Sequence, residues 1–176
     1  MKKSFKSILV LLLICATVSV LMAFTNSLTA PIIEKNEQEK IAAALLEVMP
    51  DGGSFEALDI SSYTLPATVS SVWSAENDGY IVKLVTTGYS SNMVVLCGIS
   101  HDGKIVSAKL VSSTETPAIG GQAADELAPL LVGKDAAGVD GVDTVSGATK
   151  TTAAYRAAVK DALRAFEAIE NLKEGN

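Results

Sequence analysis

The sequence predicts an α+β domain, an antiparallel sheet packed by helices, preceded by one N-terminal transmembrane helix. Three observations predict this fold class. The chain opens on a long run without charged residues, its middle holds several segments rich in β-branched residues around a hairpin signal, and it ends in a long Ala-rich segment with helical spacing of apolar residues. The 176 residues suit one domain with appendages better than two full domains.

The N-terminal region is expected to be a membrane anchor. Three lysines occur within the first six residues, and no charged residue follows until Glu34. A membrane-spanning helix needs about 20 apolar residues, so the run 8–30 is long enough to cross a bilayer. A cleaved signal peptide begins in the same way, but it needs small residues at two positions before the cleavage site. Ala23 and Ala30 each have a leucine two residues earlier, so we expect the anchor to be retained.

The charges beside this run predict its orientation. Basic residues flank the cytoplasmic end of a span, which leaves the lysine-rich N-terminus inside the cell. We therefore expect a cytoplasmic N-terminus (1–7), a transmembrane anchor (8–30) and an extracytoplasmic domain (31–176). The protein would lie in the cell membrane and contact lipid through this single span.

Composition argues against several classes of function. The formal net charge is −6 and no basic run occurs beyond the N-terminus, so nucleic-acid binding is not expected. One histidine (His101) and two cysteines (Cys15 and Cys97) are too few for a metal site, a haem or an iron–sulfur cluster built by this chain alone. Any redox chemistry would need an organic cofactor.

Periodicity and turn residues predict the order of the elements. Pro31 is expected to begin a new helix, and Asp-Gly within 101–104 predicts a hairpin. The stretch 133–142 is expected to be a loop with a short strand. The expected strands are 80–85, 93–100 and 105–111, with a shorter one within 60–74. The expected helices are 32–48, 122–132 and 151–172.

Several side chains that suggest chemistry have simpler structural explanations. We expect His101 at the surface beside the hairpin and Trp73 in the core or at its rim. Tyr155 belongs to the core-facing stripe of the final helix, where packing explains it. Arg156 and Lys160 fall largely on other faces of that helix, where solvation is sufficient.

The segment 143–152, Asp-Thr-Val-Ser-Gly-Ala-Thr-Lys-Thr-Thr, leads into the final helix. Helix N-termini have unpaired N–H groups and a positive dipole end, which together attract anions such as phosphate. Gly147-Ala148 lets a bulky partner approach the backbone. Four hydroxyl groups surround this end of the helix, those of Ser146, Thr149, Thr151 and Thr152. Ordinary helix capping explains the same residues, so the spacing leaves both explanations open.

A second motif lies between the last expected strand and the next helix. The segment 113–122, Ser-Thr-Glu-Thr-Pro-Ala-Ile-Gly-Gly-Gln, has Thr-Pro followed by two glycines. Such a strand-to-helix loop exposes backbone N–H and C=O groups. Most loops of this kind are only connections, and the residues alone do not assign this one a function.

Both motifs resemble loops of the FMN-binding domain family, which includes the G subunit of the Rnf complex and the C subunit of the sodium-pumping quinone reductase. The segment 143–149 resembles the flavinylation motif of that family, and 115–120 resembles its Glu-Thr-Pro-Gly-Leu-Gly loop. In the second loop Ala118 and Ile119 replace a glycine and a leucine. The segment 26–33 is similar to the junction that follows the anchor in Rnf G subunits. The matching residues are Asp143, Ser146, Gly147, Ala148 and Thr149 in the first motif, and Glu115, Thr116, Pro117 and Gly120 in the second.

The resemblance implies a covalently bound FMN. In this family the last Thr of the motif carries FMN through a phosphoester bond, which a separate flavin transferase installs from FAD, so the implied acceptor is Thr149. A Thr hydroxyl is a weak nucleophile and must be exposed to an enzyme that activates it. The residues implied to surround the acceptor are Asp143, Ser146, Gly147 and Ala148. Those implied to line the flavin ring are Glu115, Thr116, Pro117, Ile119 and Gly120.

The resemblance also implies a function. It is that of an electron-transfer subunit of an ion-translocating ferredoxin:NAD oxidoreductase of the Rnf type, with other membrane subunits and the flavin transferase as partners. The chain has no dinucleotide-binding glycine loop and too few cysteines for iron–sulfur clusters, so no complete active site is expected in it. The alternatives are the C subunit of a sodium-translocating quinone reductase, a stand-alone extracytoplasmic flavoprotein electron carrier and, in another class, a membrane-anchored binding domain without a cofactor.

Overall fold

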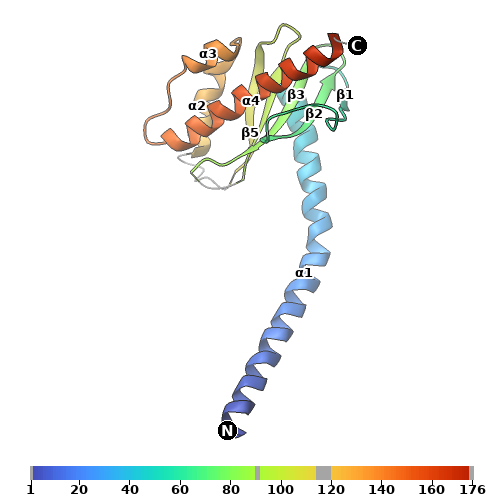
Figure 1. Ribbon diagram of the computed structural model, residues 1–176, viewed down its shortest axis with the longest axis vertical. Coiled ribbons are helices and arrows are strands. Elements are labelled where there is room, and N and C mark those ends of the chain that lie inside the picture. Colours follow the sequence, from blue (N-terminus) through green and yellow to red (C-terminus); the bar gives the residue numbers. More distant parts are fainter. Residues whose placement is uncertain (1, 90–91, 114–119, 175–176) are drawn as a thin grey trace. The chain divides into compact units, whose positions relative to one another are not determined.

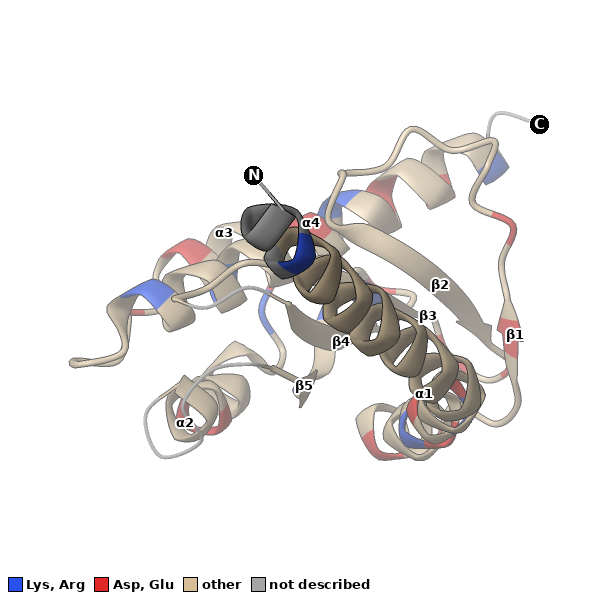
Figure 2. Cartoon of the chain, turned by 90° about the horizontal axis from the view of Figure 1, so that it is seen from below, with Lys and Arg blue, Asp and Glu red and all other residues tan. Residues whose placement is uncertain are grey.

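The computed structural model describes residues 2–89, 92–113 and 120–174, and the chain divides into two units, Met1–Lys40 and Ile41–Asn176 (Figure 1). Helix α1 (Lys2–Val48) makes up the first unit and begins the second. Its most apolar stretch has a mean hydropathy of 2.7, and the helix is long enough to cross a membrane. Figure 2 shows that stretch free of charged residues. The length and composition of α1 therefore fit a single-pass anchor.

Pro31 does not begin a new helix, contrary to expectation. It lies inside α1, which continues through it to Val48. A proline removes one backbone N–H donor and strains the preceding turn. Here the apolar run before it and the Glu-, Lys- and Ala-rich segment after it both favour helix, so one missing hydrogen bond does not end the element.

Within the described residues, five strands form one antiparallel sheet in which each strand pairs with its neighbours in sequence. The strands predicted at 80–85, 93–100 and 105–111 are confirmed to within one residue at each end. The short first strand was not expected, because three residues are too few to show an alternating pattern. The strands are β1 (Phe55–Ala57), β2 (Val69–Ala75), β3 (Tyr80–Thr86), β4 (Met93–Ile99) and β5 (Ile105–Ser112).

The predicted hairpin between β4 and β5 is present. The Ser100 amide donates to the Lys104 carbonyl at 2.9 Å, and Gly103 has φ +71, which a glycine adopts without strain. A second glycine permits a close approach between strands. A Cβ at Gly79 would lie 1.8 Å from the Ile99 carbonyl oxygen, so no side chain fits there.

Three helices follow the sheet: α2 (Gln122–Leu131), α3 (Ala136–Asp140) and α4 (Thr149–Glu174). Helix α2 contains Pro129, as expected. Helix α3 corrects the prediction of a loop with a short strand over 133–142. The Asp135 carboxylate accepts from the Gly138 amide at 2.8 Å and caps this helix. Before the cap, the Ile105 amide of β5 donates to the Lys134 carbonyl at 3.0 Å, but no strand forms there.

The strands alternate their side chains between two hydrophobic cores, one on each face of the sheet. On one face Val82 and Cys97 pack in a core that α2, α3 and α4 complete, and Figure 1 shows α4 lying along this face. On the other face Ile81 and Leu96 pack with residues from the end of α1, such as Val48. Strand β4 is thus buried on both sides, as its apolar run predicted.

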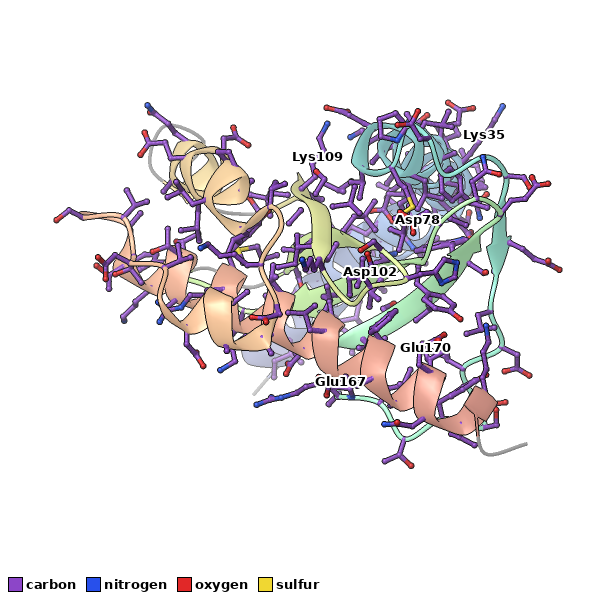
Figure 3. All side chains as sticks on the ribbon, turned by 90° about the horizontal axis from the view of Figure 1, so that it is seen from above. Lys35, Asp78, Asp102, Lys109, Glu167 and Glu170 are labelled. Atoms are coloured by element: carbon purple, nitrogen blue, oxygen red, sulfur yellow. The ribbon has the colours of Figure 1, made fainter. Side chains whose placement is uncertain are left out.

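An ion pair fastens the end of α1 to the edge strand of the sheet. Lys109, labelled in Figure 3, extends from β5 and pairs with Glu47. Both side chains are partly exposed, so we expect a modest contribution to stability from this pair.

Candidate functional site

Helix α4 begins at Thr149 itself, two residues earlier than expected. The side chains of Thr149 and Lys150 are exposed, as are Ser146 and Gly147 in the preceding loop. The first turn of the helix contains no acidic residue. The acceptor hydroxyl implied by the resemblance therefore stands at the positive end of a 26-residue helix, open to solvent.

The loop before the helix turns outward at Gly147. This residue has φ +85, a conformation that L side chains rarely adopt, and a Cβ built on it meets no atom within 4 Å. The Ala148 amide donates to the Val145 carbonyl at 3.1 Å and closes the turn. The open space beside Gly147 allows a bulky group to approach the start of the helix.

The hydroxyl groups of the motif separate into two kinds. Thr151 and Thr152 are buried, with exposures of 3% and 0%. The Thr152 hydroxyl donates to the Ala148 carbonyl at 2.9 Å and accepts from the Val145 amide at 3.3 Å, so it fixes the loop to the first turn of α4. The Thr152 hydroxyl therefore has a structural role in the motif. The exposed hydroxyls of Ser146 and Thr149 remain accessible to a reagent.

Two further side chains of α4 hold the segment that leads to the motif. The Arg156 guanidinium donates to the Val142 carbonyl, and Lys160 contacts both oxygens of Asp140 at 2.7 and 2.9 Å. The hydrogen bond from Lys160 lowers the pKa of the Asp140 carboxyl. Together with Thr152 these residues form a row with a spacing of four, which places them on one face of the helix. The sequence interpretation assigned Arg156 and Lys160 to solvent, although this spacing was visible.

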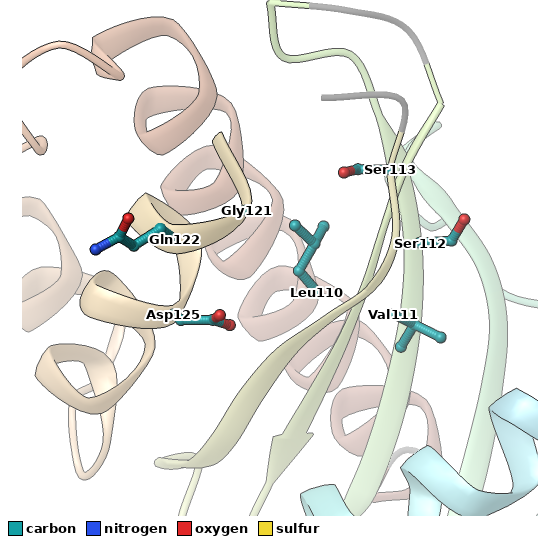
Figure 4. Close-up of a pocket in the computed structure, with 7 residues that line it drawn as sticks. All are labelled: Leu110, Val111, Ser112, Ser113, Gly121, Gln122 and Asp125. Atoms are coloured by element: carbon teal, nitrogen blue, oxygen red, sulfur yellow. The ribbon is translucent and has the colours of Figure 1, made fainter. Parts of the chain in front are cut away.

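A hollow of about 400 Å³ lies beside the motif. Gln122, Ala123 and Glu126 of α2 line it together with the loop residues 145–148. Gln122 also lines a second hollow, of about 350 Å³, between the end of β5 and the start of α2 (Figure 4). The other residues around that second hollow are Leu110, Val111, Ser112, Ser113, Gly121 and Asp125.

One end of the second motif lies beside the first motif. Ser113 and Gly121 flank the 115–120 segment, and the adjoining Gln122 borders the same hollow as Ser146 and Gly147. Gly120 is buried just before α2. The predicted flavin-ring residues Glu115, Thr116, Pro117 and Ile119, together with Ala118, lie outside the described residues. Asp143 is exposed in the loop between α3 and α4.

A third segment lies beside the start of α4, and sequence reasoning missed it. Tyr89, in the turn after β3, is 76% exposed, and the Lys150 ammonium lies 5.6 Å from the centroid of its ring. Because Lys150 adjoins Thr149, the β3–β4 turn lies beside the start of α4. The sequence did contain a signal, an aromatic residue in the polar turn Gly-Tyr-Ser-Ser, where core packing does not explain it.

The remaining aromatic and histidine predictions are confirmed where the structure describes them. His101 is exposed, and Trp73 is half-buried and packs against the core that includes Leu96. Tyr155 is fully buried, and burial raises the pKa of its phenol. Its hydroxyl has no hydrogen-bond partner among the described residues. Within that part of the chain no group of three or more His, Cys, Asp or Glu side chains could hold a metal ion.

Comparison with protein families identifies two regions. Residues 1–48 match the RnfG N-terminal region, and residues 88–164 match the FMN-binding domain. The second match begins at the turn that carries Tyr89, includes both motifs, and ends in α4. The chain thus contains an FMN-binding domain behind an RnfG N-terminal region.

Individual relatives agree with this assignment. The G subunit of the Na(+)-translocating ferredoxin:NAD(+) oxidoreductase complex of Acetobacterium woodii is 27% identical over 94% of this chain and 93% of its own length. The G subunit of the ion-translocating oxidoreductase complex of Aliivibrio fischeri is 26% identical over 65% of this chain and 60% of its own length. The G subunit of the proton-translocating ferredoxin:NAD(+) oxidoreductase complex of Clostridium ljungdahlii is 32% identical over 48% of this chain and 51% of its own.

The described residues fit an FMN group. The hollow volume lies in the range of small-molecule sites, roughly 300–1,000 Å³. The N-terminus of α4 supplies N–H groups and a positive dipole for a phosphate, without an acidic residue in its first turn to oppose it. The space beside Gly147 leaves room for the ligand where a Cβ would intrude. The start of α4 therefore suits a phosphate, and the adjoining hollow has the size of a small-molecule site.

Proposed function

We propose that this chain is the electron-transfer subunit of an ion-translocating ferredoxin:NAD oxidoreductase of the Rnf type and that it carries FMN on Thr149. One observation supports this most. An exposed Thr hydroxyl begins α4 beside a hollow lined by residues 145–148 of the first motif and by Gln122 at the end of the second, in a chain with an FMN-binding domain. The names of its relatives, each the G subunit of an oxidoreductase complex, support the assembly and the reaction.

Attachment would join Thr149 to the flavin phosphate. The Thr149 oxygen forms a bond to the phosphorus next to the flavin in FAD, the phosphoanhydride bond breaks, and AMP leaves. The hydroxyl proton passes to a base of the flavin transferase. The exposure of Thr149 suits catalysis by an external enzyme, because the base that activates a weakly nucleophilic hydroxyl must be able to reach it.

Bound FMN would supply the electron transfer, and the chain would hold and orient it. Thr152 and Arg156 hold the loop that leads to the acceptor at the start of α4. Asp143, Ser146, Gly147 and Ala148 would surround the acceptor, with Glu115, Thr116, Pro117, Ile119 and Gly120 along the ring. The completed reaction requires groups on other subunits, so this chain contributes one step within an enzyme complex.

Helix α1 would anchor this carrier to the cell membrane, with the domain on the extracytoplasmic side. The lysines at its N-terminus support that orientation. A covalent tether suits this location, because FMN that dissociated outside the membrane would be lost. Co-purification with multi-span membrane subunits would support the complex, whereas a chain that purifies alone would favour a stand-alone flavoprotein carrier.

The test is covalent flavin fluorescence on a denaturing gel after co-expression with a flavin transferase. Wild type and Thr149→Ser should both give a fluorescent band, because both keep a hydroxyl at the acceptor position. Thr149→Ala should give none. A Thr149→Ala band at full intensity would reject the acceptor, and a dark wild-type band would favour a binding domain without a cofactor.

A further inference from the structure

Tyr89 stands apart from the other aromatic residues of the domain. Among the described residues of Ile41–Asn176 it is the one large aromatic side chain that is exposed, at 76%. Tyr80 and Tyr155 are buried, and Trp73 packs against the core on the opposite face of the sheet from α4. Packing therefore explains those rings and does not explain Tyr89.

The position of Tyr89 is tied to the acceptor. Its ring lies 5.6 Å from the Lys150 ammonium, and Lys150 follows Thr149 directly in the first turn of α4. An exposed contact between a cation and an aromatic ring is weak in water, so it holds neither side chain firmly. Both side chains can therefore exchange partners when a ligand binds between them.

Lys150 carries a positive charge that can balance the negative charge of the attached phosphate. It makes no ion pair within the part of the chain that the structure describes, and the first turn of α4 offers no carboxylate. A phosphate bonded to both Thr149 and the flavin chain retains one negative charge. An ammonium on the neighbouring residue can offset it, in addition to the helix N-terminus.

We propose that Tyr89 and Lys150 form the outer wall of the flavin site, with Tyr89 stacking on the isoalloxazine ring and Lys150 pairing with the phosphate on Thr149. Aromatic rings gain from offset stacking, and an isoalloxazine offers a flat face of the required kind. Stacking would cover the exposed ring of Tyr89, while the phosphate would draw Lys150 away from it. This inference rests on the proposed attachment of FMN to Thr149.

Flavin fluorescence of the full-length protein tests the stacking. The chain is co-expressed with a flavin transferase as wild type, Tyr89→Trp and Tyr89→Leu, and intact mass measures covalent FMN. A stacked tyrosine or tryptophan ring quenches flavin emission by donating an electron to the excited flavin, so native Tyr89→Leu should emit more strongly than wild type, at equal FMN content. Tyr89→Trp should be at least as strongly quenched as wild type, because it keeps an electron-rich ring. Equal emission from all three would overturn the role of Tyr89.

Phosphorus NMR of the same flavinylated proteins tests the ion pair. The resonance of the attached phosphate should shift in Lys150→Gln and stay in place in Lys104→Gln, a matched exposed lysine in the β4–β5 hairpin. An unmoved resonance in Lys150→Gln would overturn the role of Lys150 alone. A wild-type chain without FMN would overturn this inference together with the proposed function, which keeps the two failures distinguishable.

Discussion

At the C-terminal end of α4 the Lys173 ammonium lies 4.8 Å from the centroid of the Tyr80 ring, and at the N-terminal end Lys150 lies 5.6 Å from that of Tyr89. The first ring is 1% exposed and the second 76%. Tyr80 donates to Glu170 at 2.8 Å and receives a hydrogen bond from Lys173, so cation, ring and anion are all present. Figure 3 labels Glu170 at this end of the helix.

The two ends of α4 differ in packing. We call the C-terminal end, around Tyr80 and Lys173, the closed end, because its ring is buried. We call the N-terminal end, around Tyr89 and Lys150, the open end, because its ring is exposed. The closed end packs Phe166 against Tyr80, with ring centroids 6.0 Å apart, and supplies its own carboxylate. The open end has a cation and an aromatic ring beside an exposed hydroxyl, and the first turn of α4 contains no anion. A bound phosphate with an attached flat ring would supply the missing anion at the open end, as the Glu170 carboxylate does at the closed end.

Truncation of the two tyrosines should separate the ends most strongly. Tyr80→Ala removes a buried ring and should lower the free energy of unfolding by about 3–5 kcal/mol, as for other large buried aromatics. Tyr89→Ala changes an exposed residue and should stay within about 0.5 kcal/mol. Chemical denaturation of both variants measures this. A loss of similar size at Tyr89 would mean that the open end is already packed.

Arg156→Met should give the next largest effect. It removes a charged donor from the Val142 carbonyl, and a lost hydrogen bond to a charged group costs about 1.5–3 kcal/mol. Hydrogen exchange should show faster opening of the loop 140–148, with unchanged protection around Tyr80. The control is Arg164→Met, whose ion pair with Asp161 is exposed on the arginine side and worth about 0–1 kcal/mol. Equal effects of the two substitutions would contradict the positioning role of Arg156.

Tyr155→Phe should have a small effect of opposite sign. The Tyr155 hydroxyl is buried without a partner among the described residues, and such a group is costly to bury. Its removal should leave stability unchanged or raise it by up to about 1 kcal/mol, since only the unmet desolvation is recovered. Thermal unfolding checks the sign. A clear loss of stability would show that this hydroxyl has a partner in solution.

Alkaline pH should weaken the closed end. Burial raises the pKa of Tyr80 above 10.0, and the hydrogen bond to Tyr80 raises that of Lys173 above 10.5. A raised folded-state pKa contributes stability that is complete below the unfolded value and lost as pH rises through the folded one. Burial also raises the pKa of Cys97, to about 12, with the same sign. Melting temperature should therefore begin to fall above about pH 9, where unfolded Cys97 ionises, and should fall more steeply above about pH 10. The fall should be shallower in Tyr80→Phe and unchanged in Tyr89→Phe.

The sequence was sufficient for elements with strong periodicity or turn chemistry. The apolar segments of β3 to β5, the Asp-Gly hairpin and the core stripe of α4 all lie where they were predicted. The errors occurred where a short local interaction decides the outcome. The Asp135 cap makes α3 a helix, and flanking helix formers carry α1 through Pro31.

The candidate site was only partly predictable, for a different reason. A motif names the residues of one continuous segment, and it identified Thr149 and its neighbours. It does not show which of its hydroxyls are buried. The Thr152 hydroxyl is buried and forms hydrogen bonds with the loop at Val145 and Ala148. Tyr89 is 60 residues before Thr149 in the chain, and only the antiparallel pairing of β3 with β4 brings its turn to the start of α4.

Peptide mapping of the flavinylated chain tests the central claim most directly. Trypsin cleaves after Lys134 and Lys150, so Thr149 falls in the peptide 135–150 while the two buried threonines fall in 151–156. Mass spectrometry should find one FMN on 135–150, with fragmentation placing it on Thr149. FMN on 151–156, or on neither peptide, would contradict the assignment of the open end of α4 as the flavin attachment site.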